Sequence, residues 1–302
     1  MRFSLWVGLT QSWSDVVDGV RHAEATGWDG VYVMDHFMGN VGTPGAVETP
    51  TLEGTAALAA LAMATDRVRL GTLVLGNTYR HPAVVASWAA TVDQLSGGRL
   101  LLGVGAGWQE NEHEQYGIRL PPPGERIERF EEACVVWKGL LRDPVTTFHG
   151  QHYRLTDAIC EPKPLQTPLP LLIGGKGDRM LGVVARHADE WNMWSTPATF
   201  AERSAALDAA CERIGRDPAS IHRSTQLSVY PEPDPQKGAA LVEASGGRPA
   251  VAGTPARIAE QLAAYGEVGV DELIVPTRTL GEGAERADFL AELLGACASL
   301  RG

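Results

Sequence analysis

The sequence predicts a (β/α)8 TIM barrel built as a single domain over residues 1–302. Short apolar runs of strand length alternate with longer helical patterns along the whole chain, and we count eight of each. The apolar runs lack the polar alternation of half-exposed strands, which indicates strands buried on both faces. Eight parallel strands joined by right-handed crossovers close into a barrel.

A doubly wound open sheet is the alternative architecture. It would have fewer strands and would favour a glycine-rich phosphate loop after the first strand. The chain has Gly8-Leu9-Thr10-Gln11 at that point, without the pattern G-x-G-x-x-G. The barrel therefore accounts better for the sequence.

The predicted strands are apolar and four to six residues long, as expected for the staves of a parallel barrel. The fourth lies in the first half of 99–108, an apolar run that ends in three glycines at alternate positions. The eight strands are expected at residues 3–7, 31–34, 70–75, the first half of 99–108, 169–173, 190–194, 226–230 and 272–275.

The predicted helices follow the strands and carry recognisable start signals. Ser14 is expected to cap the first helix, and Thr199 with Glu202 forms a capping box for the sixth. Thr254-Pro255 combines a capping residue with proline at the first helical position. The helices are expected at residues 14–27, 52–65, 83–95, 125–141, 178–187, 200–214, 255–265 and 284–297.

Two segments interrupt the alternation. Residues 39–50 contain several Gly and Pro residues and read as a loop. Residues 143–167 are rich in Pro, Thr and aromatic residues, and we expect a hairpin-like insertion with an extended arm between strands four and five.

Composition narrows the partners and the compartment. Lys and Arg number 26 against 37 Asp and Glu, a formal charge of −11, and no basic stripe is present, which argues against nucleic acid or an anionic membrane as partner. The four cysteines are far apart, which favours buried free thiols. Residues 1–9 lack the features of a signal peptide, and the longest apolar stretch, 56–64, is too short to span a bilayer. A cytoplasmic globular protein is expected.

Active sites of TIM barrels form from the loops at the carboxyl ends of the strands, which we call the barrel mouth. Polar residues and glycines follow five of the predicted strands at that end. They are Asp35 and His36, then Asn77, Arg80 and His81, then 105–114, then 174–177, and finally Asn192 and Trp194.

Two glycine-rich stretches permit two interpretations each. Gly103, Gly105 and Gly107 either let a flat ligand approach the backbone or only turn the chain. Residues 174–177, with Lys176, lead directly into a helix, where backbone N–H groups and the helix dipole could bind a phosphate. A plain tight turn is the alternative there.

His36 is the candidate general acid or base, because its ordinary pKa lies near neutrality and Asp35 precedes it. A histidine that only donates hydrogen bonds is the alternative. His22, His149, His152 and His222 are expected to be structural or solvated. Residues 110–114 contain three Glu and a His, but no metal-ligand spacing, so a solvated helix face is expected and no metal site.

The residues resemble the bacterial luciferase-like barrels, and within them the coenzyme F420 (deazaflavin)-dependent oxidoreductases. The resemblance covers nearly the whole chain in the right order, and its joint pattern is more specific to the family than to the cofactor. The matching stretches are residues 33–36, 70–82, 98–108, 171–175, 253–255 and 269–273.

The resemblance implies a cofactor at the barrel mouth. Family members carry a non-prolyl cis peptide in strand three, which corresponds to Leu73-Val74 here and supports one face of the tricyclic ring. It also implies cofactor or catalytic contacts for residues of the other loops, and family members are often homodimers. The implied cofactor-binding residues are Asp35, His36, Leu73, Val74, Asn77, Gly105, Gly107, Asn111, Gly174, Gly175, Lys176 and Gly177.

One position departs from the pattern of the family's sugar-phosphate dehydrogenases. They have a glutamate proton donor where this chain has Trp108, which makes a sugar phosphate an unexpected substrate. Trp13, Trp108 and Trp194, together with Trp6, would favour an apolar or aromatic small molecule by stacking, although a core role explains each of them equally well.

The sequence therefore predicts hydride transfer between C5 of F420 and an organic substrate, with His36 transferring a proton. An FMN-dependent monooxygenase of the same superfamily, which uses reduced flavin and oxygen, is the first alternative. A cofactor-binding barrel without turnover is the second. A metal-dependent hydrolase on this fold is a further alternative that lacks the ligand spacing.

Overall fold

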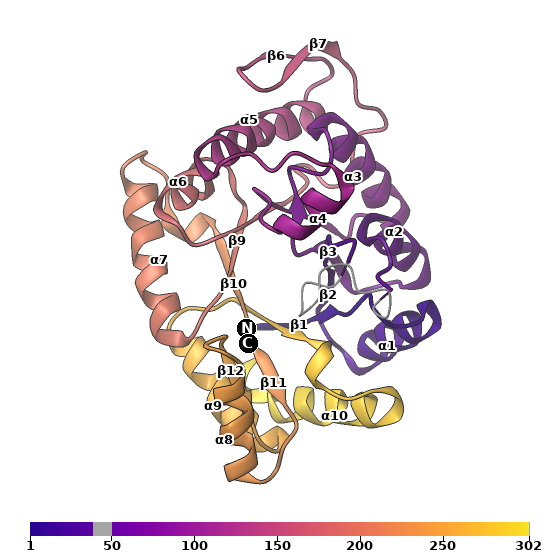
Figure 1. Cartoon of the computed structure of the whole chain (residues 1–302), viewed down its shortest axis with the longest axis vertical. Helices are drawn as coiled ribbons and strands as arrows, with labels where there is room; N and C mark the ends of the chain where they lie inside the picture. The colour runs from indigo at the N-terminus through magenta and orange to yellow at the C-terminus, as the bar shows by residue number, and fades with distance from the viewer. Residues whose placement is uncertain (39–49, 302) are drawn as a thin grey trace.

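Eight strand positions close into a parallel barrel, as the alternating pattern predicts (Figure 1). The computed structural model describes residues 1–38 and 50–301; most of the predicted 39–50 loop lies outside this part of the chain. β3 and β5 pair through Leu70 and Leu100, which completes the ring. In barrel order the strands are β1 (Arg2–Val7), β2 (Gly30–Val33), β3 (Arg69–Thr72) continued by β4 (Leu75–Gly76), β5 (Leu100–Gly105), β8 (Leu171–Gly174), β9 (Glu190–Trp194), β10 (His222–Gln226) and β13 (Glu272–Pro276).

The helices surround the barrel and bury their apolar faces against the outer side of the strands (Figure 1). Gly27 and Gly97 end two of them in the left-handed conformation that glycine adopts without strain. The surrounding helices are α1 (Trp13–Thr26), α2 (Gly54–Ala64), α3 (Pro82–Ser96), α5 (Pro123–Arg142), α6 (Asp178–His187), α7 (Pro197–Glu212), α9 (Pro255–Glu267) and α10 (Gly283–Ala296).

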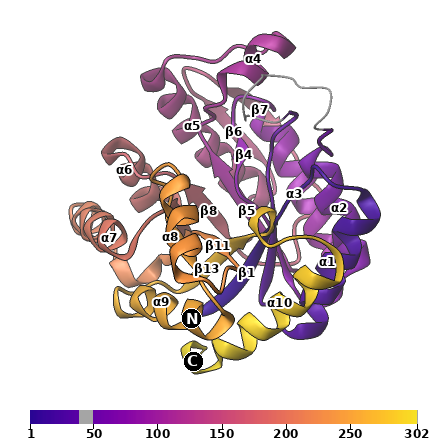
Figure 2. The same ribbon diagram turned by 60° about the horizontal axis from the view of Figure 1, so that its bottom comes forward.

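Two further helices lie in loops where the strand-and-helix alternation gave no separate element. α4 (Glu110–Tyr116) follows β5, and α8 (Pro235–Ala244) follows β11 (Ser228–Tyr230). Figure 2 shows α4 at one end of the barrel and both chain termini near the other. No helix in the described residues is long and apolar enough to cross a membrane.

The predicted insertion is a hairpin, as expected. β6 (Thr146–His149) and β7 (Arg154–Ala158) pair antiparallel beside α5 (Figure 1). The four cysteines are buried and free, which also matches the expectation.

The seventh strand was predicted at the wrong residues. The barrel strand is β10 (His222–Gln226), whereas 228–230 forms β11, which pairs with β12 (Ala250–Ala252) in a separate two-stranded sheet. The barrel segment reads His-Arg-Ser-Thr-Gln and is too polar to be recognised by hydrophobicity. These polar residues fit because Ser224 and Gln226 bond Asn192 of the neighbouring strand.

Two predicted helix caps were also placed too late in the sequence. α1 is capped by Ser12, which accepts the Asp15 N–H at 3.2 Å, so Ser14 lies inside the first turn. α7 is capped by Thr196 with Pro197 at its first position, so the predicted Thr199 cap falls within the helix. Proline pre-organises the first turn and thereby fixes the earlier start. The predicted Thr254 cap of α9 is confirmed.

The barrel interior holds a small apolar cluster apart from the main core. Trp6 and Val74, which are partly buried, pack against it, and both lie near the carboxyl ends of their strands. Packing of this kind fills the barrel and leaves no channel through it. The fully enclosed members of the cluster are Tyr32, Leu73, Leu101, Leu172 and Ile274.

Below this cluster, at the amino ends of the strands, lies a layer of buried charges. Glu190 pairs with Arg69 at 2.7 Å, and Glu272 lies 3.1 Å from Arg2. Burial alone would raise the pKa of Glu190, but hydrogen bonds and charges from His222 and Arg69 lower it to about 2. The layer therefore holds its carboxylate ionised inside the protein.

We predict that Glu190→Gln lowers the free energy of unfolding by about 3 kcal/mol at pH 7, because it leaves Arg69 without its closest buried partner. The folded-state pKa is depressed, so the contribution is fully present above the ordinary pKa of 4.5 and is lost as pH falls toward 2. Urea unfolding of both proteins across this range measures the effect. Glu292→Gln, an exposed change on α10, is the control. A deficit that is absent, or that does not shrink below pH 4.5, would contradict the assignment.

Candidate active site

The mouth is organised around a buried carboxylate. Glu112 of α4 has a side chain with no exposed surface, and it accepts hydrogen bonds from two neighbouring loops. The backbone N–H groups of Phe37 and Met38 donate to Oε1 at 2.6 and 3.0 Å. The Tyr79 hydroxyl donates to Oε2 at 2.6 Å, and Nδ1 of His36 lies 3.0 Å from the same oxygen. Glu112 thus ties the loops after β2 and β4 to α4.

The contacts within this cluster determine which of its side chains carry a charge. Burial alone would raise the pKa of Glu112, but hydrogen bonds from His36 and Tyr79 bring it below its ordinary value. Burial and the same carboxylate raise the pKa of Tyr79 well above its ordinary range. Glu112 is therefore an anion and Tyr79 a neutral donor.

The contact with Glu112 fixes the orientation of the His36 ring. With Nδ1 donating to an anion, Nε2 is the ring nitrogen left to exchange a proton with a ligand. The ring of Trp108 contacts the imidazole edge-on, with centroids 5.5 Å apart. The carboxylate that binds the imidazole is Glu112, although Asp35 is the acid next to His36 in the sequence.

Asp35 serves a different contact. It is 2% exposed, and its Oδ2 accepts the Gly76 N–H at 2.8 Å and an N–H of Arg80 at 2.9 Å. Arg80 also pairs with Glu53, the capping residue of α2. Burial raises the pKa of Asp35 despite the arginine. Asp35 therefore joins the loops after β2 and β4 beside His36.

The predicted cis peptide is present between Leu73 and Val74, where β3 passes into β4. Val74 occupies the space that two glycines leave open. A Cβ on Gly105 would lie 2.7 Å from one Val74 methyl, and a Cβ on Gly174 would lie 3.2 Å from both. The glycines of β5 and β8 thus allow Val74 to lie across them.

Gly103 and Gly107 also make room for protein atoms. A Cβ on Gly103 would lie 1.8 Å from the Thr72 carbonyl oxygen, and Gly107 has φ +86° with Thr78 beside it. The glycine pattern is therefore explained first by close packing of β3, β4 and β5. Direct contact of Gly105 or Gly107 with a ligand stays a prediction.

Several polar atoms at the mouth are buried without a hydrogen-bond partner among the described residues. Such atoms are uncommon, because each costs about 1–3 kcal/mol unless a ligand or water pairs with it. They follow β2, β4 and β5, the strands to which the resemblance assigns the cofactor ring. The acceptors are Asp35 Oδ1, Asn77 Oδ1 and Gln109 Oε1, and the donor is Asn111 Nδ2. This set fits the polar edge of a deazaflavin or flavin ring.

The predicted phosphate loop lies at the start of α6. Gly177 is its N-cap and supplies no side chain, so the first N–H groups of the helix are not capped by one. Lys176 is exposed beside it. Gly175 takes φ +142°, and its carbonyl accepts the Trp191 indole N–H at 2.7 Å, which fixes the turn. The geometry suits a phosphate, and it would also serve a plain turn.

The three tryptophans predicted to bind substrate are in different surroundings. Trp108 is 58% exposed above His36. Trp194 contacts Trp6 edge-on, with centroids 6.1 Å apart. Trp13 begins α1 and is 38% exposed, and among the described residues no ring contact joins it to the other tryptophans. The structure thus brings Trp108 to the histidine and Trp194 to the interior cluster.

The expectation of a solvated face for residues 110–114 is wrong for two of them. Glu112 and His113 are buried, because α4 lies against the loops after β2 and β4. Nδ1 of His113 donates to the Gln109 carbonyl at 2.6 Å, and Nε2 lies 2.7 Å from the Thr78 hydroxyl. A seven-residue helix has too few residues for its buried side to be read from periodicity.

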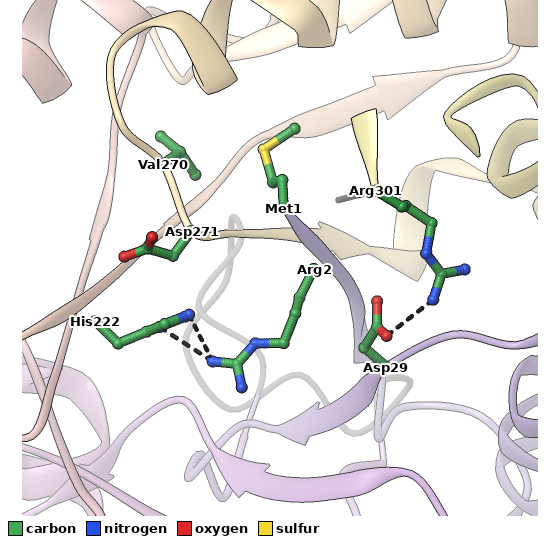
Figure 3. Close-up of a pocket in the computed structure, with 7 residues that line it drawn as sticks. All are labelled: Met1, Arg2, Asp29, His222, Val270, Asp271 and Arg301. Carbon is green, nitrogen blue, oxygen red and sulfur yellow. Dashed lines mark hydrogen bonds and ion pairs between the residues drawn. The ribbon is translucent and has the colours of Figure 1, made fainter. Parts of the chain in front are cut away.

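A cavity of about 470 Å³ lies at the opposite end of the barrel (Figure 3). Its cations already have partners: Arg2 bonds His222 at 2.7 Å and Arg301 bonds Asp29 at 2.9 Å. Glu190, His222 and Glu272 come close enough together to hold a metal ion, but Arg2 and Arg69 lie between them as counter-charges. The charged side chains at this end of the barrel are therefore paired mainly with one another.

Comparison with known proteins identifies relatives along the whole chain. The family model described as luciferase-like monooxygenase matches residues 1–245. An uncharacterized protein of Mycobacterium tuberculosis strain H37Rv is 30% identical over 292 residues, 92% of this chain and 93% of that protein. An F420-dependent glucose-6-phosphate dehydrogenase of Intrasporangium calvum is 31% identical over 233 residues, 75% of this chain and 68% of the relative.

Solved structures share the fold at lower identity. An F420-dependent secondary alcohol dehydrogenase in complex with an F420-acetone adduct superposes with a TM-score of 0.86 at 20% identity, covering 98% of both chains. Riboflavin lyase with modified FMN and riboflavin gives 0.82 at 15% identity, covering 99% of this chain and 92% of that one. The barrel is thus shared by proteins bound to either cofactor.

We predict that Glu112→Gln destabilises the protein by about 2–3 kcal/mol, because an amide NH2 cannot accept the bonds from His36 and Tyr79. Thermal and urea unfolding measure this difference. Glu114→Gln, an exposed change on the same helix, is the matched control and should change stability by less than about 0.5 kcal/mol. Equal effects of the two substitutions would show that Glu112 does not tie the loops together.

Proposed function

Because this chain belongs to the luciferase-like monooxygenase family, we propose that it is a coenzyme F420-dependent oxidoreductase acting on an organic small molecule. The relative from Intrasporangium calvum, an F420-dependent dehydrogenase by name, supports the choice of cofactor. The observation that carries the proposal is the His36–Glu112 pair at 3.0 Å, at the same end of the barrel as Val74, which lies across Gly105 and Gly174. A proton-transfer group and an apolar platform thus lie at the same end of the barrel.

The proposed cofactor site uses one continuous half of the mouth. Val74 would support one face of the ring, and the unpartnered atoms of the loops would bind its polar edge. The start of α6 would hold the phosphate through backbone N–H groups and Lys176. The proposed contacts are Asp35, His36, Leu73, Val74, Asn77, Gly105, Gly107, Asn111, Gly174, Gly175, Lys176 and Gly177.

When bound, the deazaflavin supplies two-electron hydride chemistry at its C5 atom. The protein has three tasks beside it. His36 moves a proton through Nε2 to or from the substrate oxygen or nitrogen, while Glu112 keeps Nδ1 protonated. Asp35 and Arg80 hold the loops in place. Trp108 covers His36 and limits the access of water.

The substrate proposed for this site has an apolar or aromatic part. Trp108 and Trp194 offer exposed or half-buried ring surface at the mouth, and indole rings bind flat apolar groups well. Trp13 is proposed as a third contact from the start of α1. A homodimer is proposed with the same activity, on the resemblance to dimeric family members.

An FMN-dependent monooxygenase is the second candidate. The family that matches residues 1–245 is described as monooxygenase, and the unpartnered atoms at the mouth would suit either ring. Reduced deazaflavin reacts poorly with oxygen, so the cofactor decides between a dehydrogenase and an oxygenase.

We predict that the purified protein binds F420 and shows the absorbance of a bound deazaflavin near about 420 nm, not the flavin band near about 450 nm. Titration of the protein with each cofactor, followed by absorbance and fluorescence, measures both affinities. Binding of FMN without affinity for F420 would favour the monooxygenase.

We further predict that Gly105→Ala weakens F420 binding by about tenfold or more, because the new methyl group lies 2.7 Å from Val74 and must displace it. Gly266→Ala on α9, where an added methyl group has open space, is the control and should leave the affinity unchanged. An unchanged dissociation constant for Gly105→Ala, in a protein that still folds, would remove Val74 from the cofactor site.

A further inference from the structure

The mouth divides into two halves by strand order. The residues proposed to hold the cofactor follow β2, β3 with β4, β5 and β8, which are neighbours in the barrel. The other half consists of β9, β10, β13 and β1, also in sequence around the ring. If the cofactor occupies the first half, its reaction partner must lie against the second.

The second half presents an aromatic surface with unpaired polar atoms. Trp194 ends β9 and contacts Trp6 of β1, which packs on the interior cluster. Gln226 ends β10 opposite Trp194 and is 5% exposed. Within the described residues, the Trp6 indole N–H and Gln226 Oε1 have no hydrogen-bond partner. A ligand with a flat apolar part could cover the rings.

Arg278 adds a positive charge to this half. It lies in the 3-10 turn η2 (Thr277–Thr279), directly after β13, and its guanidinium carbon is 5.9 Å from the centre of the Trp194 ring. No carboxylate in residues 1–38 and 50–301 forms an ion pair with it. The residue is exposed to solvent; partial burial of its guanidinium and the positive charge of Arg248 lower its pKa, and Tyr230 opposes this shift.

Two other arginines at the ends of the barrel are matched differently. Arg80 has Asp35 and Glu53, and Arg69 has Glu190 and Glu272. Arg278 instead has a tryptophan face and, among the charges acting on it, another arginine. The chain has a net charge of −11, yet Arg278 has no carboxylate partner among the described residues. An arginine in this position is suited to bind an anionic ligand.

We infer that Arg278 binds an anionic group of the substrate, a carboxylate or a phosphate, while Trp194 and Trp6 hold the adjoining apolar or aromatic part. The guanidinium fork can donate two parallel hydrogen bonds to either oxyanion. This inference depends on the proposed function in one respect: it assumes that the cofactor occupies the first half of the mouth. It narrows the substrate class to organic anions with a flat apolar body.

The cofactor's own phosphate is the competing anion. Its proposed site at Gly177 follows β8, and two strands, β9 and β10, separate β8 from β13. Lys176 and the start of α6 already provide a cation and N–H groups there. The position of Arg278 therefore favours the substrate as the source of the anion.

The test compares probes that share a phenyl ring and differ in the charge of the attached group. Benzoate and benzamide are titrated into the protein without cofactor and with saturating F420, and binding is measured by calorimetry and tryptophan fluorescence. Phenyl phosphate, as a third probe, tells whether carboxylate or phosphate is preferred. We expect the wild type to bind at least one anionic probe about tenfold more tightly than benzamide, and this preference to weaken with added salt.

Arg278→Met should abolish the preference and leave benzamide binding unchanged, and Arg278→Lys should keep part of it. Arg213→Met, an exposed change at the end of α7, is the matched control and should bind like the wild type. Equal binding of charged and neutral probes by the wild type, or an anion preference that survives in Arg278→Met, would overturn the inference.

A parallel F420 titration of the same variants separates the two proposals. Loss of F420 affinity in Arg278→Met with anionic probes unaffected would assign Arg278 to the cofactor and overturn the inference. Failure of the wild type to bind F420 would instead refute the proposed cofactor. The anion preference is also measured without cofactor, so its outcome does not depend on whether the protein binds F420.

Discussion

The mouth of this barrel depends on one buried carboxylate. Glu112 is hydrogen-bonded to four groups: the backbone N–H groups of Phe37 and Met38, the Tyr79 hydroxyl and Nδ1 of His36. Without an anion at this point, two backbone N–H groups, a hydroxyl and an imidazole would have to find other partners in a partly dry environment. The same contact selects the tautomer of His36, so local stability and the proposed proton transfer depend on one interaction.

The two ends of the barrel differ in how their buried polar groups are matched: ion pairs dominate at the amino ends, although Arg69 Nη1 and Glu190 Oε2 there also lack a hydrogen bond within the described part of the chain. At the amino ends of the strands, Glu190 and Glu272 are surrounded by Arg2, Arg69 and His222, and charge balances charge. At the mouth, polar atoms of Asp35, Asn77 and Asn111 have no hydrogen-bond partner among the described residues. The first arrangement stabilises the empty protein, whereas the second is stabilised once a polar ligand arrives.

The sequence was sufficient for the barrel because buried strands and amphipathic helices follow strong periodicities. It also placed Asp35, His36 and the cis peptide at Leu73-Val74, the last through family resemblance. It misplaced the seventh strand, since β10 is polar and its side chains are satisfied only by a neighbouring strand. Glu112 was missed for a similar reason: only tertiary contact distinguishes it from the exposed Glu110 and Glu114.

Trp108 and Arg278 lie on different sides of the mouth and contact different partners. An indole at position 108 cannot give up a proton as a carboxylic acid does, so the proposed proton transfer is assigned to His36, which Trp108 touches edge-on. On the other side of the mouth, Arg278 lies against Trp194 without an acid partner in the described part of the chain. Trp108 lies near His36, and Arg278 lies beside Trp194. The proposed substrate is therefore flat and apolar at its reacting centre and anionic at its far end. Such a molecule would be oriented by its charge and held by its rings, which leaves the reacting atom near Nε2 of His36.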